Sequence, residues 1–316
     1  MKPLIPQVVF WIINLMLPAM LMAKPDQIKL ALNWKPEPQF GGIYAAQFQN
    51  IFSKENLSVE ILEGGSGTPT IQMLIFGTVD AAIVSAEEIL IANEKNPKDP
   101  VLAIFATFQT NPQVILTRAD RKLISLEQLL NQKGVVSAQL GLSFVQFLRK
   151  KYPQNKVQWV PYTGGINGLL QEKDFAQQGF LTSEPLLARQ KGVEVSSFLI
   201  SEAGFNPYTS VVAVRRKDWI EKKIPLQKLN RALRSGWETY LKDPVMTNKE
   251  LVKLNPSLDL KFMNQSAEAQ SQLIKSSILG QMTLERWQAL EASLRDLGLI
   301  KTKLRAEDQF VDLTEL

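Results

Sequence analysis

The sequence predicts an α/β protein that consists of two successive units and a helical tail. Between residues 28 and 108, runs with strand character alternate with runs of helical spacing, which is typical of a mainly parallel sheet covered by helices. The alternation begins again after Pro112 and continues to residue 200. Beyond residue 215 the apolar residues recur at helical spacing, which predicts that the remainder of the chain is α-helical.

In the first unit, glycine and proline residues separate the predicted elements. The helix that begins at Thr70 should end at Gly77, because glycine readily adopts the conformation found just after a helix. The predicted strands of this unit are 28–32, 57–62, 80–84 and 101–108, and its predicted helices are 43–54, 70–76 and 86–94.

The second unit repeats the pattern, and a capping-box pattern at Ser125 and Gln128 opens its first helix. Its predicted strands are 114–117, 135–138, 157–160, 180–183 and 193–200, and its further helices are 142–151 and 166–171. In the tail, Asp243-Pro244 is an N-cap with proline at the first helical position. The tail has a predicted strand over 210–215 and helices over 226–241, after Asp243, over 265–279 and over 284–297.

Two chain crossings are expected between the units, near residues 107–112 and 201–209. We expect the helical tail to pack on the first unit. Lobe 1 then consists of residues 24–110 together with residues 206–316, and lobe 2 of residues 111–205. Two lobes joined by two crossings form a hinge with a cleft between them.

The chain of 316 residues contains neither cysteine nor histidine. This excludes zinc sites built on those residues and Ser-His or Cys-His catalytic pairs, and it removes the acid–base group most used near neutral pH. Carboxylate chemistry remains open. The net charge of +5 is scattered along the chain and forms no basic stripe with aromatic residues, so nucleic-acid binding is not expected.

The N-terminus has the pattern of an export signal. Lys2 gives a positive start, the stretch 4–22 is almost wholly apolar, and Ala23 suits cleavage, although Leu21 stands where a small residue is usual. A retained membrane anchor is the alternative, but two prolines and an asparagine interrupt the apolar stretch and favour a cleaved signal peptide of residues 1–23. With no cysteine for lipid attachment, the mature protein is expected to be free in the periplasm.

A loop rich in aromatic residues joins the first predicted strand to the first predicted helix. Open α/β sheets bind ligands at the carboxyl ends of their strands, which is where this loop lies. Trp34, Phe40 and Tyr44 are candidates to stack on a flat ring, and the alternative is that they only cap the core. In the second unit Trp159 and Tyr162 are candidates for a second aromatic wall, but plain strand packing is the favoured interpretation.

The glycine-rich segment 64–67 precedes a predicted helix. Backbone N–H groups in such a position can hold a phosphate, sulfonate or carboxylate. The segment lacks the lysine and hydroxyl residue of a nucleotide-binding P-loop, so ATP or NAD is not expected. A plain tight turn is the alternative.

Carboxylates follow one predicted strand in each unit. Glu87 and Glu88 come shortly after Ser85, and Glu184 comes directly after the strand 180–183. A carboxylate that faces the cleft would pair with a cationic or amino-substituted ring. For Glu87 and Glu88 the favoured interpretation is a carboxylate at a helix start, which the helix dipole stabilises.

Several short motifs occur in a characteristic order along the chain. They are Leu-Asn-Trp-x-Pro at 32–36, Gly-Ile-Tyr-Ala-Ala at 42–46, Gly-Gly-Ser-Gly at 64–67, Gly-Thr-Val-Asp-Ala-Ala at 77–82, Thr-Ser-Glu-Pro at 182–185 and Leu-Gly-Leu-Ile at 297–300. Together they resemble the NMT1/THI5-like solute-binding proteins of ABC importers. That family includes binders of thiamine pyrimidine precursors and is related to sulfonate and nitrate binders.

The resemblance implies a two-lobed type II periplasmic binding protein fold that closes on its ligand. It also implies that Trp34 stacks on the ligand ring and that Glu184 contacts a ring nitrogen or amine. Pyrimidine binders commonly have Asn-His where this chain has Gln39-Phe40. The fungal enzymes of the family use histidine and cysteine, which this chain lacks, so their self-consuming synthesis is not expected.

The function expected from the residues and the resemblance is non-catalytic capture of a small nitrogen-containing ring, such as a thiamine pyrimidine precursor, with no cofactor and no metal. The partners are an ABC permease and ATPase, and the binding protein itself is expected to be a monomer. An alkylsulfonate or similar anion is the alternative cargo, and an enzyme or ligand sensor is an alternative of another class. The candidate ligand-binding residues are Asn33, Trp34, Phe40, Tyr44, Gly65, Ser66, Gly67, Ser85 and Glu184.

Overall fold

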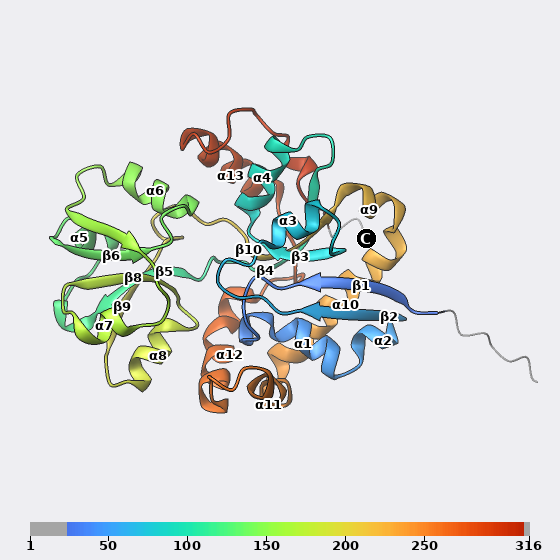
Figure 1. The fold of residues 1–316 in the computed structure, drawn as a ribbon, viewed down its shortest axis with the longest axis horizontal. Helices are drawn as coiled ribbons and strands as arrows, with labels where there is room; N and C mark the ends of the chain where they lie inside the picture. The colour runs from blue at the N-terminus through green and yellow to red at the C-terminus, as the bar shows by residue number, and fades with distance from the viewer. Residues whose placement is uncertain (1–23, 313–316) are drawn as a thin grey trace, which may run out of the picture.

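The computed structural model describes residues 24–312 and contains two five-stranded sheets with helices packed around them (Figure 1). The predicted signal peptide of residues 1–23 lies outside the described residues. The strand order is β2-β1-β3-β10-β4 in the first sheet and β7-β6-β8-β5-β9 in the second. The α/β class predicted from the sequence is confirmed.

The first sheet is the centre of lobe 1. Its strands β1, β2 and β3 are parallel, and β10 is antiparallel to both β3 and β4. Every residue of β4 is buried, as expected for a strand with both faces covered. The strands are β1 (Asp26–Ala31), β2 (Leu57–Leu62), β3 (Ala81–Val84), β4 (Val101–Phe108) and β10 (Thr209–Arg215).

The second sheet is the centre of lobe 2 and repeats the arrangement of the first. Its strands β6, β7 and β8 are parallel, and β5 is antiparallel to β8 and β9. In each sheet the antiparallel strand is the one that the chain enters after crossing from the other sheet. The strands are β5 (Gln113–Arg118), β6 (Gly134–Ala138), β7 (Val157–Pro161), β8 (Phe175–Phe180) and β9 (Val195–Leu199).

The helices that follow strands of the first sheet are η1 (Pro38–Phe40), α1 (Gly41–Phe48), α2 (Ile51–Lys54), α3 (Thr70–Ile75) and α4 (Ala86–Lys95). Those of lobe 2 are η2 (Ala119–Arg121), α5 (Leu126–Leu130), α6 (Ser143–Lys151), α7 (Asn167–Gln171) and α8 (Glu184–Gln190). The tail forms α9 (Arg216–Glu221), α10 (Lys223–Lys242), α11 (Val245–Leu254), α12 (Leu260–Ile274), α13 (Leu284–Asp296) and η3 (Ala306–Asp308).

The helical tail returns to lobe 1, where α10 packs on α1, α12 on β4 and α13 on α4 (Figure 1). Segments 109–112 and 200–208 connect the two sheets. The boundaries of the two lobes given above stay a prediction. No helix within residues 24–312 is both long enough and apolar enough to cross a membrane.

Three predicted elements differ from the structure. The helix expected over 43–54 is two helices, because Asn50 between them has a left-handed backbone with φ of 57°. The strand expected over 180–183 is β8, which ends at Phe180, and the helix expected over 265–279 is α12, which begins after the N-cap Asp259. In β8 the buried polar residues Gln177 and Gln178 hide the apolar pattern of a core strand.

Glycines allow α1 and α10 to pack against each other with almost no space between their backbones. A Cβ on Gly42 would lie 2.3 Å from the ring of Trp237, and one on Gly41 would lie 2.2 Å from the ring of Tyr240. From the other side, a Cβ on Gly236 would lie 2.2 Å from the carbonyl oxygen of Gly42. Both aromatic rings are fully buried, so this contact sets the position of the segment that leads into α1.

Arg286 of α13 ties the two crossing segments together. Its Nε donates to the carbonyl oxygen of Asn206 at 2.9 Å, its Nη2 donates to Oδ1 of the same residue at 3.0 Å, and its Nη1 donates to the carbonyl oxygen of Gln109. The guanidinium carbon lies 3.8 Å from the ring centroid of Tyr208. Burial lowers the pKa of Arg286 from its usual value, yet arginine stays charged in proteins, so both crossings are held by one cation.

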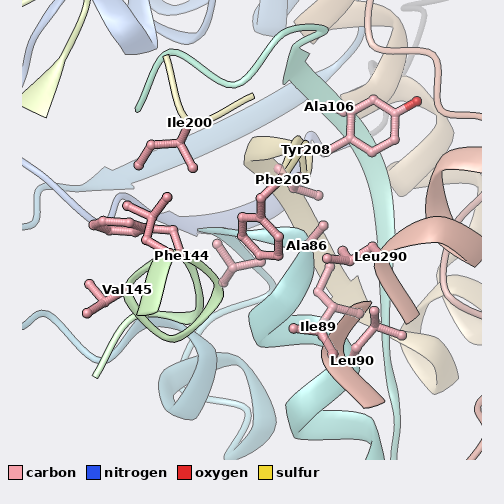
Figure 2. Packing of buried hydrophobic residues seen from close by; sticks show 14 of the residues in the cluster. Ala86, Ile89, Leu90, Ala106, Phe144, Val145, Ile200, Phe205, Tyr208 and Leu290 are labelled. Atoms are coloured by element: carbon pink, nitrogen blue, oxygen red, sulfur yellow. The ribbon is translucent and has the colours of Figure 1, made fainter. Parts of the chain in front are cut away.

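Apolar packing between the lobes surrounds this hinge. Figure 2 shows Phe144 of α6, Phe205 of the second crossing and Leu290 of α13 in the same buried cluster. The cluster continues into α4 through Ile89. An ion pair of 2.6 Å between Lys150 Nζ and an oxygen of Asp296 joins α6 to the end of α13 at the surface.

The α1–α10 contact predicts the effect of a single added methyl group. Gly42→Ala should lower the free energy of unfolding by about 1–3 kcal/mol, because the new Cβ overlaps the buried ring of Trp237. Urea unfolding measures the change. The control is Gly141→Ala, where a Cβ would meet nothing within 4 Å and the effect should stay within about 0.5 kcal/mol. Equal stability of the two variants would contradict the packing argument.

Candidate functional site

The loop that follows β1 is held in place by the C-terminal helices. Asn255 Nδ2, just after α11, donates to the carbonyl oxygen of Pro36 at 3.0 Å, and Gln270 Nε2 of α12 donates to that of Pro38 at 2.7 Å. Both amide side chains are buried. The loop is therefore fixed on both sides of Glu37, and the two prolines restrict its backbone further.

Trp34 and Glu37 form a pair within this loop. The indole Nε1 of Trp34 donates a hydrogen bond of 3.2 Å to Oε1 of Glu37. Both side chains are partly exposed, and the Trp34 side chain also packs against the core of lobe 1. The bond holds the indole plane in one orientation and leaves part of its surface accessible.

A second pair lies in lobe 2, where Tyr162 OH donates to Oε1 of Glu184 at 3.3 Å. The backbone N–H of Phe180, at the end of β8, donates to Oε2 of Glu184 at 2.7 Å. Glu184 begins α8, and Pro185 follows it at a position that suits proline. A Cβ on Gly179 would lie 2.8 Å from the same carboxylate oxygen, so a glycine is needed for the carboxylate to lie against the strand end.

The two pairs lie close enough across the junction between the lobes for their charges to interact. Burial, and after it the negative charge of Glu184, raise the pKa of Glu37 to about 7 against the lowering effects of the bond from Trp34 and the charge of Lys35. Burial also raises the pKa of Glu184. Tyr162 has a raised pKa because it is buried and because it faces both carboxylates. Helix α8, which begins at Glu184, contacts α12, which holds the Glu37 loop through Gln270.

This arrangement offers two carboxylates, an indole face and a phenol. Carboxylates accept hydrogen bonds, most strongly from charged donors, and an indole face stacks on flat rings. Residues 24–312 contain no cluster of three or more acidic side chains that would hold a metal ion. The site is therefore suited to a flat ring that carries N–H groups.

Two other candidate residues of the first loop do not face this site. Phe40 has 0% of its surface exposed and lies in the core of lobe 1, so its predicted contact with a ligand ring is not supported. Tyr44 is 3% exposed, and its ring stacks on Phe48 with 5.6 Å between centroids. Phe40 lies in η1, which packs on α12, and Tyr44 lies in α1, which packs on α10. Asn33 is partly exposed beside Trp34.

The glycine-rich segment is less suited to an anion than the sequence indicates. The N–H of Gly65 already donates to Oγ1 of Thr68 at 2.8 Å, and α3 has only six residues. Ser66 and Gly67 are exposed. The segment packs on the site loop through Gly64, whose N–H donates to the carbonyl oxygen of Trp34 at 3.1 Å.

Ser85 forms a capping box at the start of α4. Its hydroxyl accepts from the N–H of Glu88 at 3.4 Å and donates to Oε2 of Glu88 at 3.1 Å, and its own N–H donates to that oxygen at 2.8 Å. The hydroxyl proton of Ser85, which the sequence predicts to bind a ligand, is therefore already bonded to Glu88. Burial raises the pKa of the neighbouring Glu87 to about 7.

Sequence reasoning did not assign Glu37 to the site and favoured strand packing for Tyr162. The position of Glu37 between Pro36 and Pro38 is the signal in the sequence, because the two prolines restrict the backbone around it. Trp159, considered together with Tyr162, instead donates to Oδ1 of Asn155 at 3.3 Å and packs beside α6.

Comparison with known proteins agrees with this architecture. A family profile described as NMT1/THI5 like matches residues 37–247. The riboflavin-binding protein RibY of Chloroflexus aurantiacus is 22% identical over 309 residues, which covers 91% of this chain and 85% of that protein. A formylaminopyrimidine-binding protein of Halalkalibacterium halodurans is 19% identical over 302 residues, with 92% and 91% covered.

Among solved structures, the periplasmic aliphatic sulphonate binding protein SsuA from Escherichia coli has the same fold. The TM-score is 0.71 at 11% identity, and the match covers 91% of this chain and 92% of that one. The predicted two-lobed type II periplasmic binding protein fold is confirmed by this likeness and by the two sheets.

The raised pKa of Glu37 predicts a pH-dependent stability. Its folded-state pKa of about 7 lies above the ordinary value of 4.5, so folding favours the protonated form. This stabilisation is complete below about pH 4.5 and is lost as the pH rises through 7. Glu37→Gln stays neutral, so it should raise the free energy of unfolding at pH 8 by about 1–3 kcal/mol and change it little near pH 4.5.

Urea unfolding at both pH values measures this difference. Glu87→Gln is the matched variant, because the pKa of Glu87 is also raised to about 7 while Glu87 lies on another element. In the double variant, the effects of Glu37→Gln and Glu87→Gln on the free energy of unfolding should be additive. A constant difference between Glu37→Gln and the wild type at both pH values would contradict the assignment.

Proposed function

The chain belongs to the NMT1/THI5-like family, and from that membership we propose that it is the substrate-binding component of an ABC import system. Its cargo is a small, flat, nitrogen-containing ring. The observation that carries this proposal is the pair of carboxylates, Glu37 and Glu184, that face each other across the lobes beside the indole of Trp34.

Trp34 stacks on the ring in this proposal, an interaction worth about 1–3 kcal/mol for bases on aromatic side chains. Glu184 accepts a hydrogen bond from a ring N–H or amine, and its negative charge strengthens that bond. Closure of the lobes at the Arg286 hinge completes the site around the ligand. A thiamine pyrimidine precursor is one cargo of this kind.

The names of two relatives support a ring as cargo. One is called a riboflavin-binding protein and the other a formylaminopyrimidine-binding protein, and both of those ligands contain a flat nitrogen heterocycle. The two rings differ in size, so the names of the relatives support this class of cargo and do not point to a single compound.

An alkylsulfonate is the alternative cargo, because a sulphonate-binding protein shares the fold. The electrostatics oppose it. A sulfonate between Glu37 and Glu184 would meet two acidic groups, and the N–H of Gly65 is already bonded to Thr68. Lys35 is the cation beside Glu37, and it is exposed.

We propose that this activity takes place in the periplasm. The protein is exported to the periplasm by a cleaved signal peptide, acts there as a monomer without cofactor, and delivers its cargo to a permease and an ATPase at the inner membrane. It is a binding protein and not an enzyme. This is supported by relatives that are named as binding proteins and by a chain that lacks histidine and cysteine.

Substitution of Trp34 tests the stacking role. Trp34→Ala should weaken the binding of the ring compound by about 5- to 150-fold, which corresponds to the loss of one stacking contact. Isothermal titration calorimetry with a panel of aminopyrimidines, riboflavin and alkanesulfonates provides the affinities. Trp159→Phe is the control and should bind as the wild type does, because its indole bonds to Asn155. An unchanged affinity in Trp34→Ala would refute the role.

Substitution of Glu184 separates the two kinds of cargo. Glu184→Gln should weaken ring binding by at least tenfold, because a charge-assisted hydrogen bond is lost. If the cargo is a sulfonate, the same variant should bind it more tightly, since a repelling charge has been removed. Tighter sulfonate binding with no measurable ring binding would overturn the proposal in favour of the alternative.

A further inference from the structure

We infer that Glu37 is a second ligand-binding carboxylate and that it selects a cargo which presents N–H donors, or a positive charge, to both lobes at once. This rests on the proposed function, because it concerns the chemistry of the same ligand. Glu184 alone would require a donor on only one edge of the ring. With Glu37 opposite, a ring that has donors on one edge leaves the other carboxylate without a partner.

The geometry of Glu37 prepares it for this role. Its Oε1 accepts from Trp34 Nε1 at 3.2 Å, and within residues 24–312 its Oε2 has no hydrogen-bond partner. The backbone on both sides is held by the bonds from Asn255 to Pro36 and from Gln270 to Pro38. The carboxylate therefore stays in place without a ligand, and one oxygen remains free to accept.

The bond from Trp34 also sets the position of Glu37 relative to a ring that stacks on the indole. An indole N–H lies in the plane of its ring, so Oε1 of Glu37 lies close to the edge of the indole. A ring stacked on the indole is displaced by about 3.5 Å from that plane. Its edge then comes within reach of the second oxygen of Glu37, while Glu184 approaches from the other lobe.

The charged and titratable groups around Glu37 lead to a measurable consequence. They are Lys35 on the same loop, Glu184 at the start of α8 and Tyr162 after β7, while the groups from the C-terminal helices are neutral amides. Because the pKa of Glu37 is about 7, its carboxyl group is protonated in about half of the molecules at pH 7. Donors on both edges of a ligand stabilise both ionised carboxylates, so binding should release that proton.

The inference also predicts which rings are rejected. A ring whose edge toward Glu37 carries only acceptors needs that carboxyl to keep its proton, and a sulfonated or phosphorylated ring brings a negative charge toward two acids. Diaminopyrimidines with exocyclic amines on opposite edges of the ring fit the pair of carboxylates best.

Calorimetric titration of the mature protein with 2,5-diaminopyrimidine, whose two amines lie on opposite edges of the ring, tests the inference. Titrations at pH 7 in phosphate and in Tris, which have different ionisation enthalpies, give the number of protons released. The wild type should release about half a proton, and its affinity should rise about tenfold from pH 6 to pH 8, as follows for a group with a pKa of about 7. Glu37→Gln should bind at least tenfold more weakly, with less proton release and with an affinity that depends less on pH than that of the wild type.

Glu87→Gln is the control, because its carboxyl has a similarly raised pKa and lies on another element, and it should retain both affinity and proton release. The inference is overturned if the pyrimidine binds to the wild type and Glu37→Gln binds it equally, or if binding takes up a proton instead of releasing one. In either case the proposed function stands. If no ring compound binds to the wild type, the proposed function fails, and this inference fails with it.

Discussion

The site depends on the contact between the loop after β1 and the helices at the other end of the chain. Gly41 and Gly42 let α1 press against Trp237 and Tyr240 of α10, and two buried amides from the tail bind the carbonyl groups on either side of Glu37. Within the first unit the N–H of Gly64 binds the carbonyl oxygen of Trp34, but the bonds to the carbonyl groups on both sides of Glu37 come from the tail. The tail thus positions one half of the site, although it contributes none of the proposed ligand-binding side chains.

The hinge connects the half of the site that contains Glu184 to the half that contains Glu37. Arg286 binds both crossing segments, and the apolar cluster around Phe205 and Leu290 packs the lobes on each other beside it. A single cation therefore holds both crossings together at one point. Rotation about that point would change the separation of Glu37 and Glu184 while leaving each hydrogen-bonded pair intact. In the proposed function, ligand recognition and lobe closure would therefore be coupled through the electrostatic repulsion of the two carboxylates.

Much of the fold could be predicted from the sequence, because most strands have the apolar pattern of a core strand. Strands β2 and β4 have the predicted bounds, since one alternates and the other is apolar throughout. Strand β8 was misplaced because Gln177 and Gln178 are polar but buried, and their amides bond to Gly165 and to the backbone of Gln139. Such bonds join segments that are distant in sequence, and no local pattern indicates them.

The site could be predicted only in part for the same reason. Trp34 and Glu184 follow strand ends and match family motifs, whereas Glu37 gains its role from a residue 147 positions later in the chain. Phe40 resembles Trp34 in the sequence, yet it lies in η1, which packs on α12, and is buried in the core. The chemical type of a side chain was therefore readable from the sequence, but the direction in which it points was not.

The central claim is that Glu37 and Glu184 face each other across the two lobes. Carbon-13 NMR titration of the glutamate carboxyl groups, in the wild type and in Glu184→Gln, measures this directly. The Glu37 carboxyl, assigned by its absence in Glu37→Gln, should titrate near pH 7, and its midpoint should fall when the charge of Glu184 is removed. A Glu37 midpoint that is the same in both proteins would contradict it.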